Sequence, residues 1–315
     1  MSASTSIAGL PSSTAGDWLQ LLKPRVLVLV VYTAVAGLLV APGTMQPVLG
    51  FAALLSIAVA AGASGALNMW YDRDIDAVMS RTARRPIPAG RIAAEEALAF
   101  GVVLAVASVM VMGLAANFMA AGWLALSILF YVLVYTVWLK RRTAQNIVIG
   151  GAAGAFPPII GWVAVTGHLA LLPVLMFAIV FVWTPPHFWS LALYASGDYA
   201  RAGVPMLPVV AGARVTRANI LAYTLLLAAL SVAPWLLGLT GPVYGVVAVV
   251  LGLWFSWHAL RVWRDQADAS GRSRRNDAAA RAAFRFSILY LFVLFGALVV
   301  DRLVVPGLAL HGWLG

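Results

Sequence analysis

The residues best suited to chemistry lie in one short stretch, NMWYDRDIDAVMSRTARRPIPAGR, which runs from Asn68 to Arg91. It directly follows a long apolar segment and contains three aspartates and five arginines. Asn68, Asp72 and Asp76 are spaced four residues apart, so at about 100° per residue their side chains share one stripe of a helix. Asp74 would face the other way on the same helix. The spacing therefore predicts three oxygen-bearing side chains on one face.

Three oxygen donors on one helical face are typical of a site for a hard cation. Mg²⁺ takes one or two carboxylates and leaves its other positions to water and phosphate oxygens. The arginines suit phosphate, because guanidinium forks match phosphate oxygens. The alternative interpretation is a solvated loop in which the acids pair with the arginines and the arginines only set membrane orientation. The position favours the metal site, since a carboxylate at membrane depth costs about 2.5–3.5 kcal/mol on insertion scales.

The composition indicates an integral membrane protein. The chain has 315 residues, of which 63% are hydrophobic and 10% charged, whereas soluble domains have about 25% charged residues. Uncharged runs long enough to cross a bilayer, about 20 residues each, recur along the sequence. Nine spans are expected, at residues 19–41, 46–69, 95–115, 118–138, 146–165, 171–194, 219–239, 242–261 and 283–303.

The basic residues predict the orientation of these spans. Links between spans alternate between short ones without Lys or Arg and longer basic ones, and 20 of the 21 basic residues fall on one side when the spans number nine. Arg302 is the exception. The positive-inside rule then places the N-terminus and the long loops in the cytoplasm and the C-terminus outside. The net charge of +10 therefore reflects topology and not nucleic-acid binding, and the expected location is a bacterial inner (plasma) membrane.

We expect one transmembrane domain, residues 18–305, flanked by a flexible cytoplasmic tail at 1–17 and a short outer tail at 306–315. The first 16 residues contain no Lys or Arg, which fits neither a secretory signal nor a mitochondrial transit peptide. The sequence contains no cysteine. Disulfides, thiolate catalysis and cysteine metal sites are therefore excluded.

Four blocks of sequence resemble the UbiA-type intramembrane prenyltransferases. The first is Asn68-xxx-Asp72-xxx-Asp76 followed by MSRTARRPIPAGR, and the others are NIVIGGAAGAFPPIIGW (146–162), WTPPHFWSLALY (183–194) and DYARAGVPMLPVV (198–210). Their order and spacing suit that family from about residue 18 to residue 303. The last two blocks are most similar to the members that farnesylate heme.

The resemblance implies an all-α bundle of nine transmembrane helices around a central cavity, open to the cytoplasmic side and laterally to the lipid bilayer. It implies Mg²⁺-dependent transfer of a farnesyl group from farnesyl diphosphate to the ring A vinyl group of heme B. Asn68, Asp72 and Asp76 would hold the Mg²⁺–diphosphate complex. A heme A synthase or a cytochrome oxidase assembly factor would be a possible recipient of the product.

The second aspartate motif departs from the family pattern. Many members carry Asp-xxx-Asp after the sixth span, whereas this chain has Tyr194-xxx-Asp198. Asp198 could hold a second Mg²⁺ or orient Arg201, and the Tyr194 hydroxyl could bond a phosphate oxygen. The expected metal ligands are Asn68, Asp72, Asp76 and Asp198. The expected catalytic residues are Asp72, Asp76, Arg85 and Asp198, and the expected substrate-binding residues are Asn68, Arg81, Arg84, Arg91, Asn146, His187, Tyr194, Tyr199 and Arg201.

His187 lies in the sixth span directly after Pro185 and Pro186, which we expect to interrupt the helix. Three roles are open to it: a ligand of heme iron, a partner of a heme propionate, or a partner of a backbone carbonyl that the prolines leave free.

Two rival functions are open. Prenyl transfer to another aromatic or tetrapyrrole acceptor would use the same aspartate stripe. A secondary transporter would place its polar site near the bilayer midplane and often shows paired repeats. Here the acids cluster at the cytoplasmic ends of the second and sixth spans, and no repeat is evident, which favours the enzyme.

Overall fold

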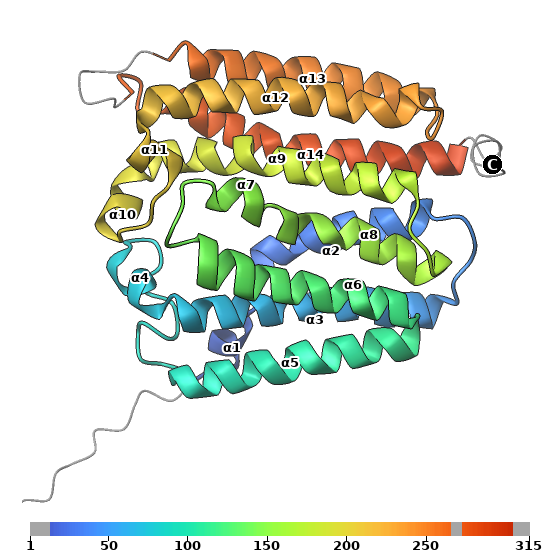
Figure 1. Ribbon diagram of the computed structural model, residues 1–315, viewed down its shortest axis with the longest axis horizontal. Coiled ribbons are helices and arrows are strands. Elements are labelled where there is room, and N and C mark those ends of the chain that lie inside the picture. The colour runs from blue at the N-terminus through green and yellow to red at the C-terminus, as the bar shows by residue number, and fades with distance from the viewer. Residues whose placement is uncertain (1–12, 266–272, 305–315) are drawn as a thin grey trace, which may run out of the picture.

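The computed structural model describes residues 13–265 and 273–304 and is built from helices that run along one common direction (Figure 1). Residues 1–12 and 306–315, which hold most of the expected tails, lie outside the described residues. In chain order the elements are α1 (Ala15–Leu21), α2 (Pro24–Val40), α3 (Pro47–Tyr71), α4 (Arg73–Val78), α5 (Ala94–Ala115), α6 (Phe118–Leu129), the π-helix η1 (Phe130–Leu139), α7 (Asn146–Gly150), α8 (Ala152–Thr166), α9 (Leu171–Tyr194), α10 (Ser196–Arg201), α11 (Leu207–Val210), α12 (Gly212–Leu236), α13 (Pro242–Trp263) and α14 (Ala278–Val304).

The helices account for the expected spans. Within the described residues, eight helical stretches are long and apolar enough to cross a membrane, and α1 with α2 forms a further span bent by 53°. With that pair counted as the first span, the described part of the chain contains the nine spans that the charge pattern predicts. The chain is therefore a multi-pass membrane protein.

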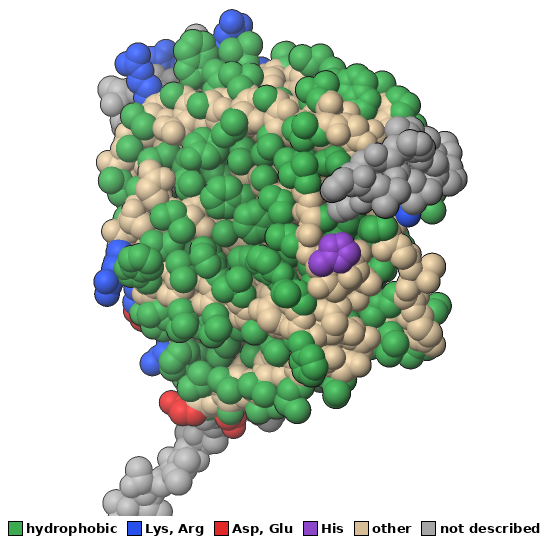
Figure 2. All heavy atoms as spheres, turned by 45° about the vertical axis from the view of Figure 1, so that its right-hand side comes forward, with side chains coloured by type: hydrophobic (Ala, Val, Ile, Leu, Met, Phe, Trp, Pro, Cys, Tyr) green, Lys and Arg blue, Asp and Glu red, His purple; other side chains and the backbone are tan. Residues whose placement is uncertain are grey.

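The polar connections gather at one end of the bundle. The short helices α4, α10 and α11 all lie at the left-hand end in Figure 1. On the face shown in Figure 2, hydrophobic side chains cover most of the surface, and Lys and Arg side chains collect mainly along the left-hand edge. Large apolar side chains such as Leu114, Phe118 and Leu253 are fully or largely exposed. Such a surface is stable in contact with lipid, not water.

The prolines of the sixth span do not interrupt it, so that expectation is wrong. α9 is continuous through Pro185 and Pro186. Side chains supply backbone hydrogen bonds on both sides of the prolines, from the Thr184 hydroxyl to the Val180 carbonyl and from the Ser190 hydroxyl to the Pro186 carbonyl. The rest of α9 is held in place by packing of its buried side chains in the main hydrophobic core.

The fifth span, Asn146–Thr166, is interrupted at a glycine pair between α7 and α8. Gly150 packs against the ring of Tyr135 on η1, and Gly151 packs against Thr184 on α9, so a Cβ at either position would collide with them. Further along α8, Gly161 lies against the backbone of Ala34 on α2. Small residues therefore seat α8 between α2, η1 and α9.

Candidate active site

The aspartate stripe lies where α3 runs into α4. The Asp72 N–H donates to the Asn68 carbonyl and the Asp76 N–H donates to the Asp72 carbonyl, which carries the helical register across the junction. Asn68, Asp72 and Asp76 are all buried, whereas 63% of the Asp74 side chain is exposed. Within the stripe, Asn68 Nδ2 donates to Asp72 Oδ2 at 2.7 Å. The spacing thus correctly predicted which side chains share a face and which one turns away.

Asp72 is held by cations from the link after η1. Lys140 Nζ donates to Asp72 Oδ2, and Arg141 Nη2 lies 3.6 Å from Asp72 Oδ1. Because the Asp72 side chain is fully buried, these charges compensate the cost of taking a carboxylate out of water. The basic segment 140–142, expected only to orient the chain in the membrane, therefore contributes directly to the site.

The other two members of the stripe also have cationic partners. Arg85 Nη1 lies 2.6 Å from Asp76 Oδ2, and Lys23 Nζ donates to Asn68 Oδ1 at 2.6 Å. Lys23 stands between α1 and α2, in the left-handed backbone region, so the bend of the first span brings its side chain to the stripe. Two buried carboxylates are thus surrounded by four basic side chains from three parts of the chain.

The residues at this site fit a hard cation. Their donors are carboxylate and amide oxygens, and the buried Asp72 Oδ1 accepts no hydrogen bond from the residues that the structure describes. No group of three His, Cys, Asp or Glu side chains forms a metal cage in the described residues, so protein ligands alone would leave several coordination positions open. That is the pattern of Mg²⁺, which shares its coordination between one or two carboxylates, water and phosphate.

A π-helix forms the wall opposite the stripe. Thr136 Oγ1 on η1 accepts from Asn68 Nδ2 at 3.1 Å. Tyr131 and Tyr135 on the same element have ring centroids 5.3 Å apart. π-helical turns occur frequently at functional sites. Here η1 brings an aromatic pair and Lys140 to the stripe.

The expected second motif joins the loop after α4. Asp198 Oδ1 accepts from the Ser80 hydroxyl at 3.0 Å and also pairs with Arg201. Arg81 Nη2 donates to the Tyr199 hydroxyl at 2.9 Å. Burial raises the pKa of Tyr199, against the opposing effect of the Arg81 guanidinium. These contacts tie the two loops together, and among the described residues Asp198 contacts Ser80 and Arg201 and not the aspartate stripe.

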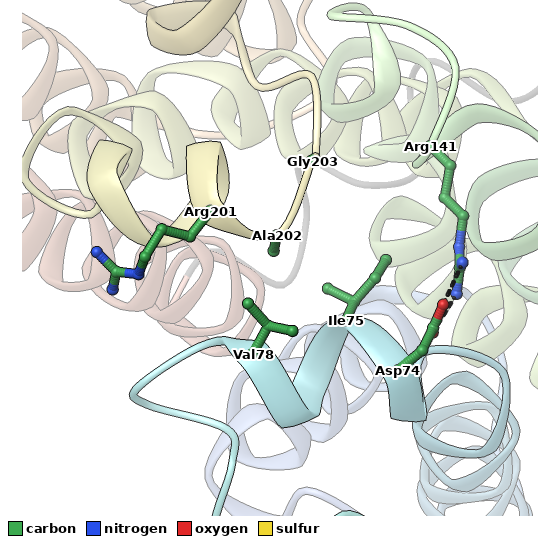
Figure 3. Close-up of a pocket in the computed structure, with 7 residues that line it drawn as sticks. All are labelled: Asp74, Ile75, Val78, Arg141, Arg201, Ala202 and Gly203. Atoms are coloured by element: carbon green, nitrogen blue, oxygen red, sulfur yellow. Dashed lines mark hydrogen bonds and ion pairs between the residues drawn. The ribbon is translucent and has the colours of Figure 1, made fainter.

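A cavity of about 340 Å³ lies between these loops, lined by Asp74, Ile75, Val78, Arg141, Arg201, Ala202 and Gly203 (Figure 3). The Arg141 guanidinium bonds both oxygens of Asp74, each at 2.7 Å, and lowers the pKa of that carboxyl. The Arg201 side chain extends away from this pair at the far side of the cavity. The cavity therefore separates a surface ion pair from the Asp198 contacts.

Three other expected substrate-binding residues have structural contacts. Arg91 Nε lies 2.7 Å from Asp17 Oδ1 on α1, and Arg91 Nη2 donates to the Arg84 carbonyl. Asn146 is buried at the start of α7, where Nδ2 reaches the Lys140 carbonyl at 3.4 Å and Oδ1 accepts no hydrogen bond. Arg91 thus fastens the loop to α1, and Asn146 supports the segment that carries Lys140.

Tyr194 and His187 contact α14 instead of the aspartates. The Arg281 guanidinium lies 4.3 Å from the centre of the Tyr194 ring. The His187 ring stacks on Trp183 and Phe284, and its Nδ1 is 2.7 Å from the Ser287 hydroxyl. The sequence offered no signal for these contacts, because Arg281 to Ser287 are about 90 residues or more away in the chain.

Membrane-spanning helices form a bundle, and buried carboxylates and basic side chains cluster at one end of it. This arrangement defines a multi-pass membrane protein with a polar site inside the bundle. A model of the UbiA prenyltransferase family matches residues 30–288, and the chain belongs to that family.

Relatives of high identity extend over nearly the whole chain. A protein of Acidiphilium cryptum named protoheme IX farnesyltransferase is 67% identical, covering 94% of this chain and 93% of its own length. A protein of the same name from Granulibacter bethesdensis is 66% identical, covering 93% and 92%.

Solved structures share the fold at low sequence identity. A digeranylgeranylglyceryl phosphate synthase superimposes with a TM-score of 0.74 at 18% identity, covering 92% of this chain and 98% of its own. A UbiA homologue from Archaeoglobus fulgidus, bound to DMAPP and Mg²⁺, superimposes with a TM-score of 0.65 at 16% identity, covering 89% and 99%. The arrangement of helices is therefore that of known UbiA proteins.

Proposed function

We propose that this protein transfers a farnesyl group from farnesyl diphosphate to the ring A vinyl group of heme B, which gives heme O and diphosphate. The observation that carries the proposal is the cluster of two buried carboxylates and four basic side chains at one end of the bundle. It occurs in a chain 66–67% identical to two proteins named protoheme IX farnesyltransferase. The cluster supports a diphosphate substrate, and the relatives support farnesyl and heme.

The reaction breaks the bond between farnesyl C1 and its oxygen, and diphosphate leaves with the electron pair. The terminal carbon of the vinyl group forms the new bond to C1, which leaves positive charge on the vinyl carbon next to the ring. Water adds there and loses a proton, completing the hydroxyethylfarnesyl group. Charge must therefore be stabilised on the leaving oxygens, and water must be kept from the allylic cation.

Asn68, Asp72 and Asp76 are the proposed ligands of a first Mg²⁺, and Asp198 is proposed either to hold a second Mg²⁺ or to orient Arg201. When bound, Mg²⁺ supplies positive charge to the leaving diphosphate. Lys140 and Arg85, which pair with the acids, would also donate hydrogen bonds to the phosphate oxygens of a bound diphosphate. The same basic groups would then stabilise both the buried carboxylates and the departing diphosphate.

The loop contacts suggest how the remaining residues act. Arg81 and Tyr199, joined by a hydrogen bond, and Arg201, paired with Asp198, are proposed to bind diphosphate at the cytoplasmic face. Arg84, Arg91 and Asn146 are proposed to support substrate binding through the loops that they hold. The aromatic rings of η1 could stabilise the allylic cation by their π faces.

A membrane location suits the two amphipathic substrates. Both farnesyl diphosphate and heme B combine an apolar body with an anionic end, so a site at one end of the spans could receive them from lipid. The proposed location is the bacterial inner membrane, with the N-terminus in the cytoplasm and one transmembrane domain at 18–305. A heme A synthase or an oxidase assembly factor is the proposed recipient of heme O.

A reconstituted assay tests this function. Purified protein in nanodiscs is incubated with heme B, farnesyl diphosphate and Mg²⁺, and mass spectrometry detects heme carrying the hydroxyethylfarnesyl group. Omission of farnesyl diphosphate and addition of EDTA are the controls, and both should abolish the product. A folded preparation that yields no farnesylated heme would refute the proposal, and product with a different aromatic acceptor alone would favour the rival prenyl transfer.

A further inference from the structure

An aromatic column connects α9 with α14 near the basic end of the bundle. The His187 ring stacks between Trp183, at 4.3 Å and 17°, and Phe284, at 4.6 Å and 24°. Phe284 in turn meets Tyr194 edge to face at 6.4 Å. Trp183 is buried, whereas His187, Phe284 and Tyr194 are partly exposed. Trp183 and Phe284 cover the faces of the His187 ring, so the accessible parts of the column are the edge of His187 and the outer surfaces of Phe284 and Tyr194.

Two arginines stand at the outer end of this column. Arg281 and Arg285 lie on successive turns of α14, and both are exposed. The Arg281 guanidinium lies 4.3 Å from the centre of the Tyr194 ring, and Arg285 follows one turn further along α14. In the described parts of the chain, neither arginine forms a salt bridge with a carboxylate. Two cations thus flank an aromatic surface, and no carboxylate among the described residues lies within salt-bridge distance of either.

His187 is fixed in position and keeps one nitrogen available. Its Nδ1 is 2.7 Å from the Ser287 hydroxyl, while Trp183 Nε1 donates to the Ser287 carbonyl at 2.7 Å. Nε2 makes no hydrogen bond to any residue that the structure describes. The imidazole is therefore held by α14 on one edge, and its other edge is free to meet a ligand.

The column also borders the loops of the donor site. Tyr194 ends α9, α10 follows directly with Tyr199, and Arg81 donates to the Tyr199 hydroxyl at 2.9 Å. Arg281 and Arg285 are separate from the basic side chains that pair with the aspartate stripe. An anion bound by these two arginines would lie beside the diphosphate site without competing for Lys140 or Arg85.

We infer that Arg281 and Arg285 bind the two carboxylates of the heme acceptor, with the tetrapyrrole ring packed along the Tyr194–Phe284–His187 surface. This inference rests on the proposed function and adds an acceptor subsite to it. Guanidinium groups match carboxylates in geometry and charge, and a planar aromatic ligand gains from face and edge contacts with aromatic side chains. The dicarboxylate edge would face the cytoplasm, so the vinyl edge would point into the bundle.

The carboxylates of the ligand provide a direct test. Heme B and its dimethyl ester have the same ring, iron and vinyl groups, but the ester lacks both negative charges. Binding of each is measured by Soret titration of purified protein in nanodiscs of phosphatidylcholine, so that anionic lipid does not occupy the arginines. Wild-type protein should bind the ester about tenfold or more weakly than heme B, the effect of losing charge-assisted hydrogen bonds.

The variant R281Q/R285Q should bind heme B as weakly as wild-type protein binds the ester, and should not discriminate between the two. R281K/R285K, which keeps the charge, should retain part of the discrimination. R261Q is the matched control, because Arg261 is also an exposed arginine over an aromatic ring, 4.7 Å from Trp257 on α13, and it should behave as wild type. Thermal unfolding checks that each variant is folded.

Kinetics provide a second readout. In the farnesylation assay, R281Q/R285Q should raise the KM for heme B about tenfold or more and leave the KM for farnesyl diphosphate unchanged. Equal binding of heme B and the ester by wild-type protein, or full discrimination by R281Q/R285Q, would overturn the subsite. Failure of wild-type protein to farnesylate any heme would instead refute the proposed function, so the two failures are distinguishable.

Discussion

The ends of α3 and α9 start from similar sequence and form different sites. Each helix runs from an apolar span into a short helix that carries aspartate. At the end of α3, Asp72 and Asp76 are buried and bonded to basic side chains from distant segments. At the end of α9, the single Asp198 pairs with Arg201 three residues away and with Ser80.

The difference shows what makes an acidic cluster a site. A buried carboxylate needs partners brought together by the fold, and the loss of one partner leaves an uncompensated charge. A carboxylate paired within its own helix and near the surface gains little from its partner. The end of α3 therefore depends on the whole bundle, whereas the ion pair at the end of α9 forms within α10 and is joined to the rest of the chain through the Ser80 hydroxyl.

The largest expected effect is loss of turnover in D72N. The change keeps the shape of the side chain and removes the charge that the site is built to hold. Farnesylation should fall by about 10²–10³-fold or more, comparable with the loss of one key electrostatic group in other enzymes. Product is measured by mass spectrometry on protein that elutes normally in size exclusion. Activity within tenfold of wild type would show that the buried stripe is not the diphosphate site.

The next comparison concerns stability and uses K140M and R201Q. K140M leaves the fully buried Asp72 without its closest cation, which should destabilise by at most about 3–5 kcal/mol because Arg141 remains nearby. R201Q removes the ion pair with Asp198, in which 56% of the arginine side chain is exposed. This change should lower the free energy of unfolding by only about 0–1 kcal/mol. Thermal unfolding in one detergent compares them. Equal destabilisation by both would remove the proposed contrast between the two ends.

D198N tests how much the second end contributes to chemistry. If Asp198 acts mainly by holding Arg201 and Ser80, turnover should fall about tenfold, the scale of one charge-assisted hydrogen bond. S80A, which removes one of these contacts, should have a smaller effect. The Mg²⁺ dependence of turnover is measured for each. A loss as large as that of D72N, with a shifted Mg²⁺ dependence, would instead make Asp198 a full metal ligand.

Much of the fold could be predicted from the sequence, because lipid requires long apolar helices and the basic links set their direction. The shared face of Asn68, Asp72 and Asp76 followed from helical spacing alone. Lys23 and Lys140 were missed as partners because their position depends on the bend after α1 and on the π-helix η1, which the sequence does not signal. The continuity of α9 through Pro185 was also missed, since it depends on side-chain hydrogen bonds and packing.

The smallest expected effect belongs to Asp74, the acid that turns away from the stripe. Its pair with Arg141 lies at the surface, so D74N should lower stability at neutral pH by only about 0.2–1 kcal/mol and leave turnover within about twofold. Because Arg141 lowers the pKa of this carboxyl from its usual 3.8, the stabilisation is present above that value and disappears as the pH falls through the lowered pKa.

Two conditions should therefore abolish the difference in stability between D74N and wild-type protein. Unfolding measured at decreasing pH should show the two proteins converging below the usual carboxyl pKa, and 1 M salt at neutral pH should have the same effect, since exposed pairs are screened. D72N should keep its loss of turnover in high salt, because Asp72 is fully buried. A D74N defect that persisted in salt would place Asp74 with the buried acids, and the distinction by helical face would no longer hold.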